Sequence, residues 1–163
     1  MNQLPEILFA SSDPSQSRKI QSWLKEGRVK PLIPRAYTSN LEDPLEQIVR
    51  RNIWLLVSYM FPDALISHRT AIEYRISPNN NLYLTAGSRR VYRWPGVNIR
   101  ITEGLGPLED DGVYMHELRV SSLERACLEN LSSSRTVEGE KRTVDQAVIE
   151  ERLLSLLNTR GEV

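Results

Sequence analysis

Residues 15–39 hold the side chains of this chain that are best suited to bind a charged partner. At about 100° per residue, a helix that begins near Pro14 turns an apolar side inward, made by Ile20, Trp23 and Leu24. Arginine and lysine donate hydrogen bonds to phosphate oxygens and to base edges, and serine hydroxyls also bond to both. We therefore predict that the opposite, outer side of this helix contacts DNA through Ser15, Arg18, Lys19, Ser22 and Lys25.

Two elements must position these side chains, a helix and a hairpin. Asp13 and Pro14 start the helix, since Asp accepts free N–H groups of the first turn and Pro suits that position, and Gly27 predicts a left-handed stop. Residues 28–34 and 35–39 then predict two short strands. Three cations around this hairpin are placed to hold phosphates: Arg28, Lys30 and Arg35. A helix followed by a basic hairpin indicates a winged-helix-like unit over residues 1–40, preceded by one short helical stretch at residues 5–10.

Positive and negative charges are concentrated in different parts of the chain. The 163 residues are 40% hydrophobic and 26% charged, with a net charge of zero. Residues 1–100 contain 14 Lys/Arg and 8 Asp/Glu, or +6, whereas residues 101–163 contain 7 and 13, or −6. A basic part that meets phosphates and an acidic part that docks a protein partner or a neighbouring domain would have this asymmetry. The alternative is that the charged helix face is only solvated.

An α+β body is predicted from residue 41 to residue 131. Apolar residues at helical spacing predict helices at residues 43–61, 67–75 and 122–131. Alternation with turn signals over residues 81–102 predicts an antiparallel meander, and a further strand is expected at residues 113–120, giving an antiparallel sheet packed by helices. Residues 132–163 are expected to form a polar linker, about residues 132–142, and an amphipathic helix at residues 144–158. That helix either folds back onto the body or awaits another domain or subunit.

Residues that could support catalysis lack the neighbours that they need. His68 and His116 have no second His or Cys at ligand spacing, and Cys127 lies in an apolar helical pattern typical of a buried thiol. The acidic run at residues 109–111 does not have EF-hand spacing and is read as a solvated turn. We therefore expect no enzyme activity, catalytic residue, metal or cofactor. The absence of an export signal or an apolar segment of membrane-spanning length favours a cytoplasmic protein without membrane contact.

Three stretches of the body, taken in their order along the chain, resemble a known pattern. They are residues 65–71 (Leu-Ile-Ser-His-Arg-Thr-Ala), the meander with Arg89, Arg90, Gly96 and Val97, and residues 120–126 (Val-Ser-Ser-Leu-Glu-Arg-Ala). Preceded by a winged helix that ends in an Arg-Ala-Tyr strand, they resemble the AbiEi-like antitoxin and transcriptional regulator family of bacterial type IV toxin–antitoxin systems. The resemblance covers residues 15–131. The chain departs from the family in offering one helical stretch before the predicted recognition helix, where two are usual, and in its proline-rich hairpin.

The resemblance implies a winged helix that binds operator repeats in double-stranded DNA and represses its own operon, with a body that counters a toxin. Family DNA contacts fall on residues 15–25 and on the wing at residues 28–35. Similar domains also occur in front of Fic-type or other toxin-like enzymes, so a fused catalytic domain is a possible partner. The alternative is a non-enzymatic interaction module that acts on a toxin or a fused domain without DNA, and a metal-dependent hydrolase or nuclease is the third reading. The operator, the toxin and the oligomeric state stay open.

Overall fold

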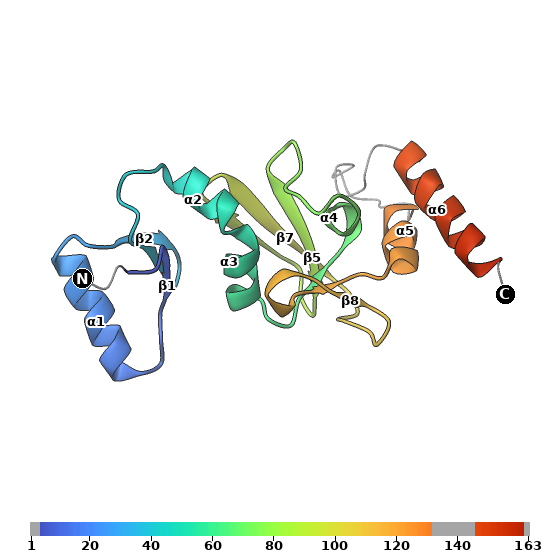
Figure 1. Cartoon of the computed structure of the whole chain (residues 1–163). Helices are drawn as coiled ribbons and strands as arrows, with labels where there is room; N and C mark the ends of the chain where they lie inside the picture. Colours follow the sequence, from blue (N-terminus) through green and yellow to red (C-terminus); the bar gives the residue numbers. More distant parts are fainter. Residues whose placement is uncertain (1–3, 132–145, 162–163) are drawn as a thin grey trace.

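The protein is described by a computed structural model over residues 4–131 and 146–161, and it has an α+β fold. A three-stranded sheet with helix α1 lies at one end of the molecule, and helix α6 lies at the other (Figure 1). Between them, a six-stranded sheet is packed by the remaining helices (Figure 1). The predicted fold class is confirmed at this level, and the domain boundaries stay predictions.

The N-terminal unit runs β1 (Ile7–Phe9), α1 (Pro14–Lys25), β2 (Lys30–Ile33) and β3 (Ala36–Thr38), with sheet order β1-β3-β2 and antiparallel pairing. The helix and the hairpin occur where expected. The short helix predicted at residues 5–10 is wrong, because this segment is strand β1. The extended backbone lets Ile7 and Phe9 pair with β3 and pack their side chains toward the body, which local periodicity does not encode.

The unit therefore contains one helix. A helix-turn-helix uses a first helix across the DNA backbone and a second in the major groove. Only the second has a counterpart within residues 4–40, and the winged-helix assignment stays a prediction.

The helix predicted at residues 43–61 is two helices, α2 (Leu45–Arg51) and α3 (Ile53–Met60). The break is at Asn52, whose φ of −106° and ψ of 14° leave the helical range. The Asn52 amide donates to the carbonyl oxygen of Ile48 at 2.9 Å and to the Glu6 carboxylate at 2.8 Å. The second bond reaches Glu6, the residue before β1, so the break in the helix serves a tertiary contact.

The body sheet is mixed, and the predicted antiparallel meander is wrong. Its strands are β4 (Leu65–Ile66), β5 (Asn81–Ala86), β6 (Arg90–Trp94), β7 (Val97–Glu103), β8 (Gly112–Val113) and β9 (Arg119–Val120), in the order β6-β7-β5-β4-β9-β8. Strand β5 pairs with β7 in parallel, and β6 is an antiparallel edge strand beside β7. Burial explains the order, because residues 81–85 of β5 are all buried, whereas most of β6 is exposed.

Three further helices, α4 (His68–Glu73), α5 (Leu123–Leu131) and α6 (Gln146–Arg160), lie close to the predicted positions. The strand expected over residues 113–120 is instead split into β8 and β9 by the 3₁₀ helix η1 (Met115–Glu117). Residues His116 and Glu117 have φ values of 57° and 62°, which no continuous strand can accommodate. The predicted linker at residues 132–142 lies outside the described residues.

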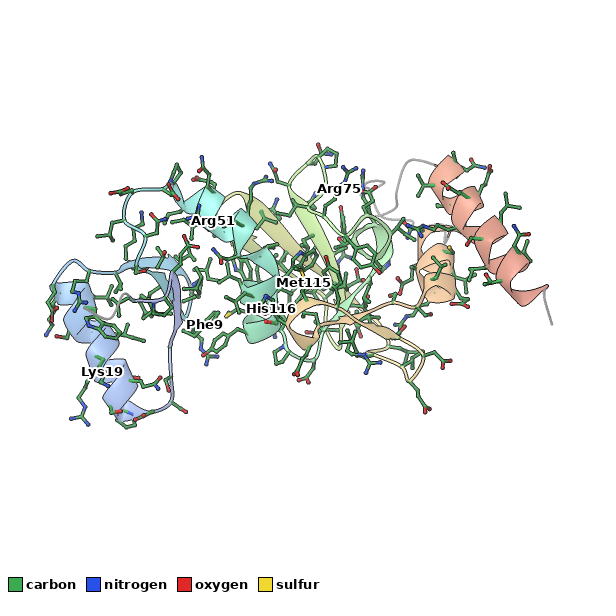
Figure 2. All side chains as sticks on the ribbon, in the orientation of Figure 1. Phe9, Lys19, Arg51, Arg75, Met115 and His116 are labelled. Carbon is green, nitrogen blue, oxygen red and sulfur yellow. The ribbon has the colours of Figure 1, made fainter. Side chains whose placement is uncertain are left out.

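One apolar cluster joins the N-terminal sheet to the body. Ile7 and Ala36 belong to the same buried cluster as Val49 and Leu56 of α2 and α3. At the contact, the rings of Phe9 and Tyr59 stack at 3.9 Å with an angle of 15° between their planes. Figure 2 shows Phe9 between the N-terminal sheet and the body, while Lys19 lies on α1 at the end of the molecule.

Candidate nucleic-acid interface

Helix α1 holds the predicted contact residues on its solvent side. The Asp13 carboxylate caps the helix by accepting the N–H of Ser15 at 2.8 Å, and Gly27 ends the segment with a φ of 67°. Ile20 is buried beneath the helix, and Trp23 and Leu24 are half-buried. All five predicted residues of the outer side are exposed: Ser15, Arg18, Lys19, Ser22 and Lys25.

The cations of this side keep their capacity to bind a partner. Nε of Arg18 donates to the carbonyl oxygen of Pro14 at 3.1 Å, which orients the guanidinium along the helix. Over residues 4–131 and 146–161, no carboxylate forms an ion pair with Arg18, Lys19 or Lys25. By contrast, the hydroxyl of Ser22 donates to the Glu26 carboxylate at 2.6 Å.

Arg28 lies just beyond the helix. Its guanidinium carbon is 5.9 Å from the centre of the Trp23 ring, and Nη1 is 3.6 Å from the Glu26 carboxylate. With half of its side chain exposed, Arg28 extends the basic surface past the end of α1.

The other two cations predicted for the wing, Lys30 and Arg35, lie away from α1. Nζ of Lys30 donates to the carbonyl oxygens of Leu41 and Asp43, at 3.2 Å each. Arg35, in the hairpin turn with a φ of 66°, places its guanidinium 5.9 Å from the centre of the Tyr59 ring of α3. Both side chains approach the body, so the structure does not bring them together with the α1 residues.

A polar clamp, which sequence patterns did not predict, fixes the N-terminal unit to α2. Arg51 of α2, which is labelled in Figure 2, binds the Glu6 carboxylate and also the Asp43 carboxylate at 2.7 Å. Its hydrogen bond is the main cause that lowers the pKa of Glu6 to about 2, with Asn52 and Asn40 adding to it against partial burial. Residues 45 positions apart carry no local signal of this contact.

The two outer stretches of the AbiEi-like resemblance meet in space. Strands β4 and β9 pair in parallel, which brings the segments after Ile66 and Val120 side by side. Glu129 of α5 joins them, because its carboxylate accepts the main-chain N–H of His68 at 2.8 Å, the Ser121 hydroxyl at 3.0 Å and Nε of Arg125 at 3.1 Å. Glu129 lies beyond both stretches, so the sequence patterns did not point to it.

This cluster is built as a structural network. Ser67 is fully buried, and its hydroxyl accepts from Thr85 at 2.8 Å and lies 2.9 Å from Nδ1 of His68. Glu129 meets the main chain of His68 in that contact. In a serine–histidine–carboxylate relay, by comparison, the carboxylate orients the imidazole ring.

The acidic run at residues 109–111 is only partly the solvated turn that was predicted. Glu109 and Asp110 are exposed, but Asp111 is buried and forms an ion pair with Arg125 at 2.7 Å. Burial favours a higher pKa for Asp111, but the N–H groups of Leu108 and Ser122 and the Arg125 guanidinium outweigh it and lower the pKa. Among the residues described, no group of three or more His, Cys, Asp or Glu side chains could hold a metal ion.

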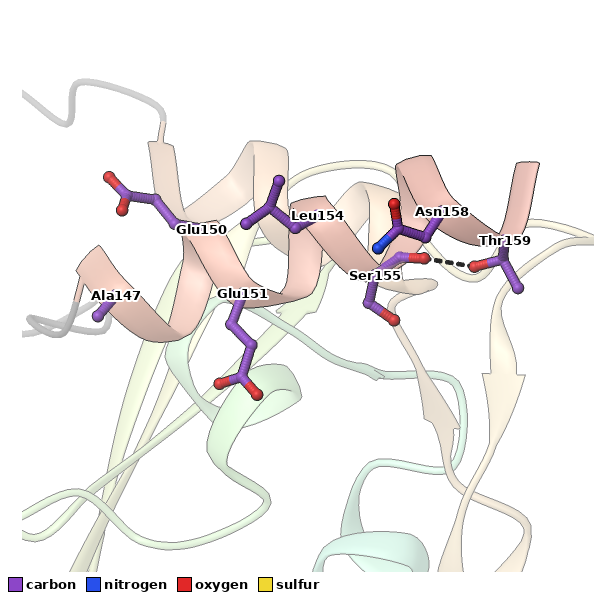
Figure 3. Close-up of a pocket in the computed structure, with 7 residues that line it drawn as sticks. All are labelled: Ala147, Glu150, Glu151, Leu154, Ser155, Asn158 and Thr159. Atoms are coloured by element: carbon purple, nitrogen blue, oxygen red, sulfur yellow. Dashed lines mark hydrogen bonds between the residues drawn. The ribbon is translucent and has the colours of Figure 1, made fainter. Parts of the chain in front are cut away.

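The C-terminal helix has one packed side and one open side. Helix α6 packs against α5 and buries Ile149, while Leu154 and Leu157 are 59% and 69% exposed. Figure 3 shows the open side, where Glu150, Glu151 and Leu154 belong to a shallow hollow whose described lining residues all come from α6. The helix therefore folds back and still presents apolar side chains to solvent.

No family model matches the chain, and no curated protein or solved structure shows significant similarity to it. Within the described ranges, none of the helices combines the length and apolar character that crossing a membrane requires.

Proposed function

We propose that this protein is a DNA-binding regulator that contacts double-stranded DNA through the outer side of α1. The observation that carries the proposal is the position of α1 at one end of the molecule (Figure 1), together with the solvent exposure of its basic residues Arg18, Lys19 and Lys25. A twelve-residue helix is about 18 Å long, and the major groove of B-DNA, about 12 Å wide, admits such a helix.

The side chains divide by position. Arg18, Ser22 and Lys25 lie on one side of the helix and contact base edges, while Lys19 and Arg28 flank them and hold phosphates. Lys30 and Arg35 are left out of the phosphate contacts, because Lys30 already binds two carbonyl oxygens and Arg35 approaches Tyr59.

The antitoxin character belongs to the same proposal. An AbiEi-like regulator represses its own operon and counters a toxin, and the body with the open side of α6 would serve the second task. The exposed Leu154 and Leu157 also favour the second candidate, a protein-interaction module without DNA contact.

Fluorescence anisotropy with a labelled duplex from the region upstream of the gene tests the DNA contact. The double variant Arg18→Ala with Lys25→Ala is compared with Arg89→Ala with Arg90→Ala, which removes two exposed arginines of the body. We expect the α1 variant to bind at least about tenfold more weakly and to reduce the salt slope by about 2. The control pair is expected to bind as the wild type does. Absence of binding at low salt, or equal losses in both variants, contradicts DNA contact through α1.

A further inference from the structure

Strand β1 leaves part of its main chain open. The sheet order β1-β3-β2 places β1 at an edge. Toward β3, the carbonyl oxygen of Glu6 accepts from Ser39 N at 3.1 Å, and Ala10 N donates to the carbonyl oxygen of Arg35 at 2.8 Å. Main-chain groups alternate along an antiparallel strand, so those of Leu8 face β3, while those of Ile7 and Phe9 point away from it.

Among the described residues, none outside the sheet forms a hydrogen bond with the main chain of Ile7 or Phe9. An unpaired edge of this kind is a template for another extended chain.

A cleft of about 450 Å³ runs along this edge. One wall is Pro5 and the three residues of β1, and the other is Gln16, Lys19, Ile20 and Trp23 of α1. Consecutive side chains of a strand point to opposite faces, so a cleft that touches all three β1 residues follows the edge of the strand.

The lining fits a peptide with apolar and acidic residues. The side chains of Leu8 and Trp23 are half-buried and that of Ile20 is buried, so the floor of the cleft is apolar. Lys19 supplies a cation at its side, and no ion pair with a carboxylate occupies it in the described structure. Six Lys/Arg against three Asp/Glu in residues 1–40 add an electrostatic preference for an acidic segment.

We propose that the cleft between β1 and α1 binds an extended, acidic segment of a protein partner, which adds to β1 as a fourth strand. Main-chain groups of Ile7 and Phe9 bond to the added strand, one apolar side chain of the segment enters the cleft, and an acidic side chain pairs with Lys19. This site shares Lys19 with the DNA face but differs from it in its other residues, because Arg18 and Lys25 are absent from its lining.

Selection of random octapeptides on the immobilised full chain, followed by amide exchange with the best peptide, tests the proposal. We expect enriched peptides to alternate apolar and polar residues and to include an acidic one. Bound peptide should slow exchange of the Ile7 and Phe9 amides at least about tenfold, while Leu8, already paired with β3, changes little. Methylating alternate main-chain nitrogens of the peptide should weaken binding about tenfold or more without altering the protein.

Charge exchange tests the role of Lys19. Lys19→Glu should weaken the selected peptide about three- to fivefold, and a peptide with lysine in place of its acidic residue should regain the loss. Arg18→Ala with Lys25→Ala should leave peptide binding unchanged, which separates this test from that of DNA contact.

Three results overturn the proposal: no peptide enriched, enriched peptides that leave exchange at Ile7 and Phe9 unaltered, or protection of these amides that rises with protein concentration alone. The last result assigns the edge to a second copy of this chain.

Discussion

The clamp between Glu6 and Arg51 makes the N-terminal unit sensitive to acid. In Arg51→Met the aliphatic stem remains and both ion pairs are lost. The pKa of Glu6 falls from its ordinary 4.5 to about 2, which at 1.36 kcal/mol for each pH unit gives an upper limit of about 3 kcal/mol. The Arg51 side chain is 41% exposed and that of Glu6 is 33% exposed, so solvent screening makes the ion pair weaker than this upper limit. We therefore expect Arg51→Met to lower the free energy of unfolding by about 1 kcal/mol at pH 7.

The pH dependence distinguishes the clamp from lost packing. Glu6 has a lowered pKa in the folded protein, so its contribution is complete above about pH 4.5 and is lost as the pH falls toward 2. The free energies of unfolding of wild type and Arg51→Met, measured in urea, should differ at pH 7 and converge as the pH approaches 2. Arg89→Ala, at an exposed position, is the control. A difference that is the same at pH 7 and pH 2, or that is absent at both, refutes this reasoning.

Three further substitutions test single contacts through urea unfolding at pH 7. Asp111→Asn removes a buried charge that holds an arginine and two main-chain N–H groups, and we expect a loss of about 2 kcal/mol or more; a loss under about 0.5 kcal/mol would contradict it. Gly96→Ala should cost about 2 kcal/mol, since φ is 72° and a Cβ would lie 2.9 Å from Cβ of Glu46; a neutral result counts against this strain. Tyr59→Phe keeps the ring stack and loses the hydrogen bond to the Ala10 carbonyl, so about 1 kcal/mol is expected, and an unchanged midpoint would show that the bond contributes nothing.

Local patterns predicted the elements whose cause is local. Helix α1 begins and ends where Asp13 and Gly27 indicate, because a capping carboxylate and a residue that tolerates positive φ act within a few residues. Its exposed basic side also follows from a 3.6-residue period alone.

The predictions of secondary structure were wrong where residues far away in the sequence decide the local conformation. Residues 7–9 are extended because they pair with residues 36–38 of β3, and the predicted helix of residues 43–61 breaks where the Asn52 side chain reaches Glu6. The parallel pairing of β5 with β7 goes with the burial of β5, whose residues 81–85 are all covered by other parts of the protein. Hydrophobic periodicity along the chain does not indicate which strand is covered in this way.

The sequence by itself determined which side of α1 is charged, where the turns lie and that helices and strands are combined, because these depend on residue type and short-range spacing. Only the tertiary structure decided that Lys30 and Arg35 approach the body, that Glu129 joins two distant stretches, and that β1 presents an open edge beside α1. The physical reason is that ion pairs, strand order and buried contacts join residues far apart in the chain. Which residues form these contacts depends on how the core packs and on which buried polar groups still need a hydrogen bond.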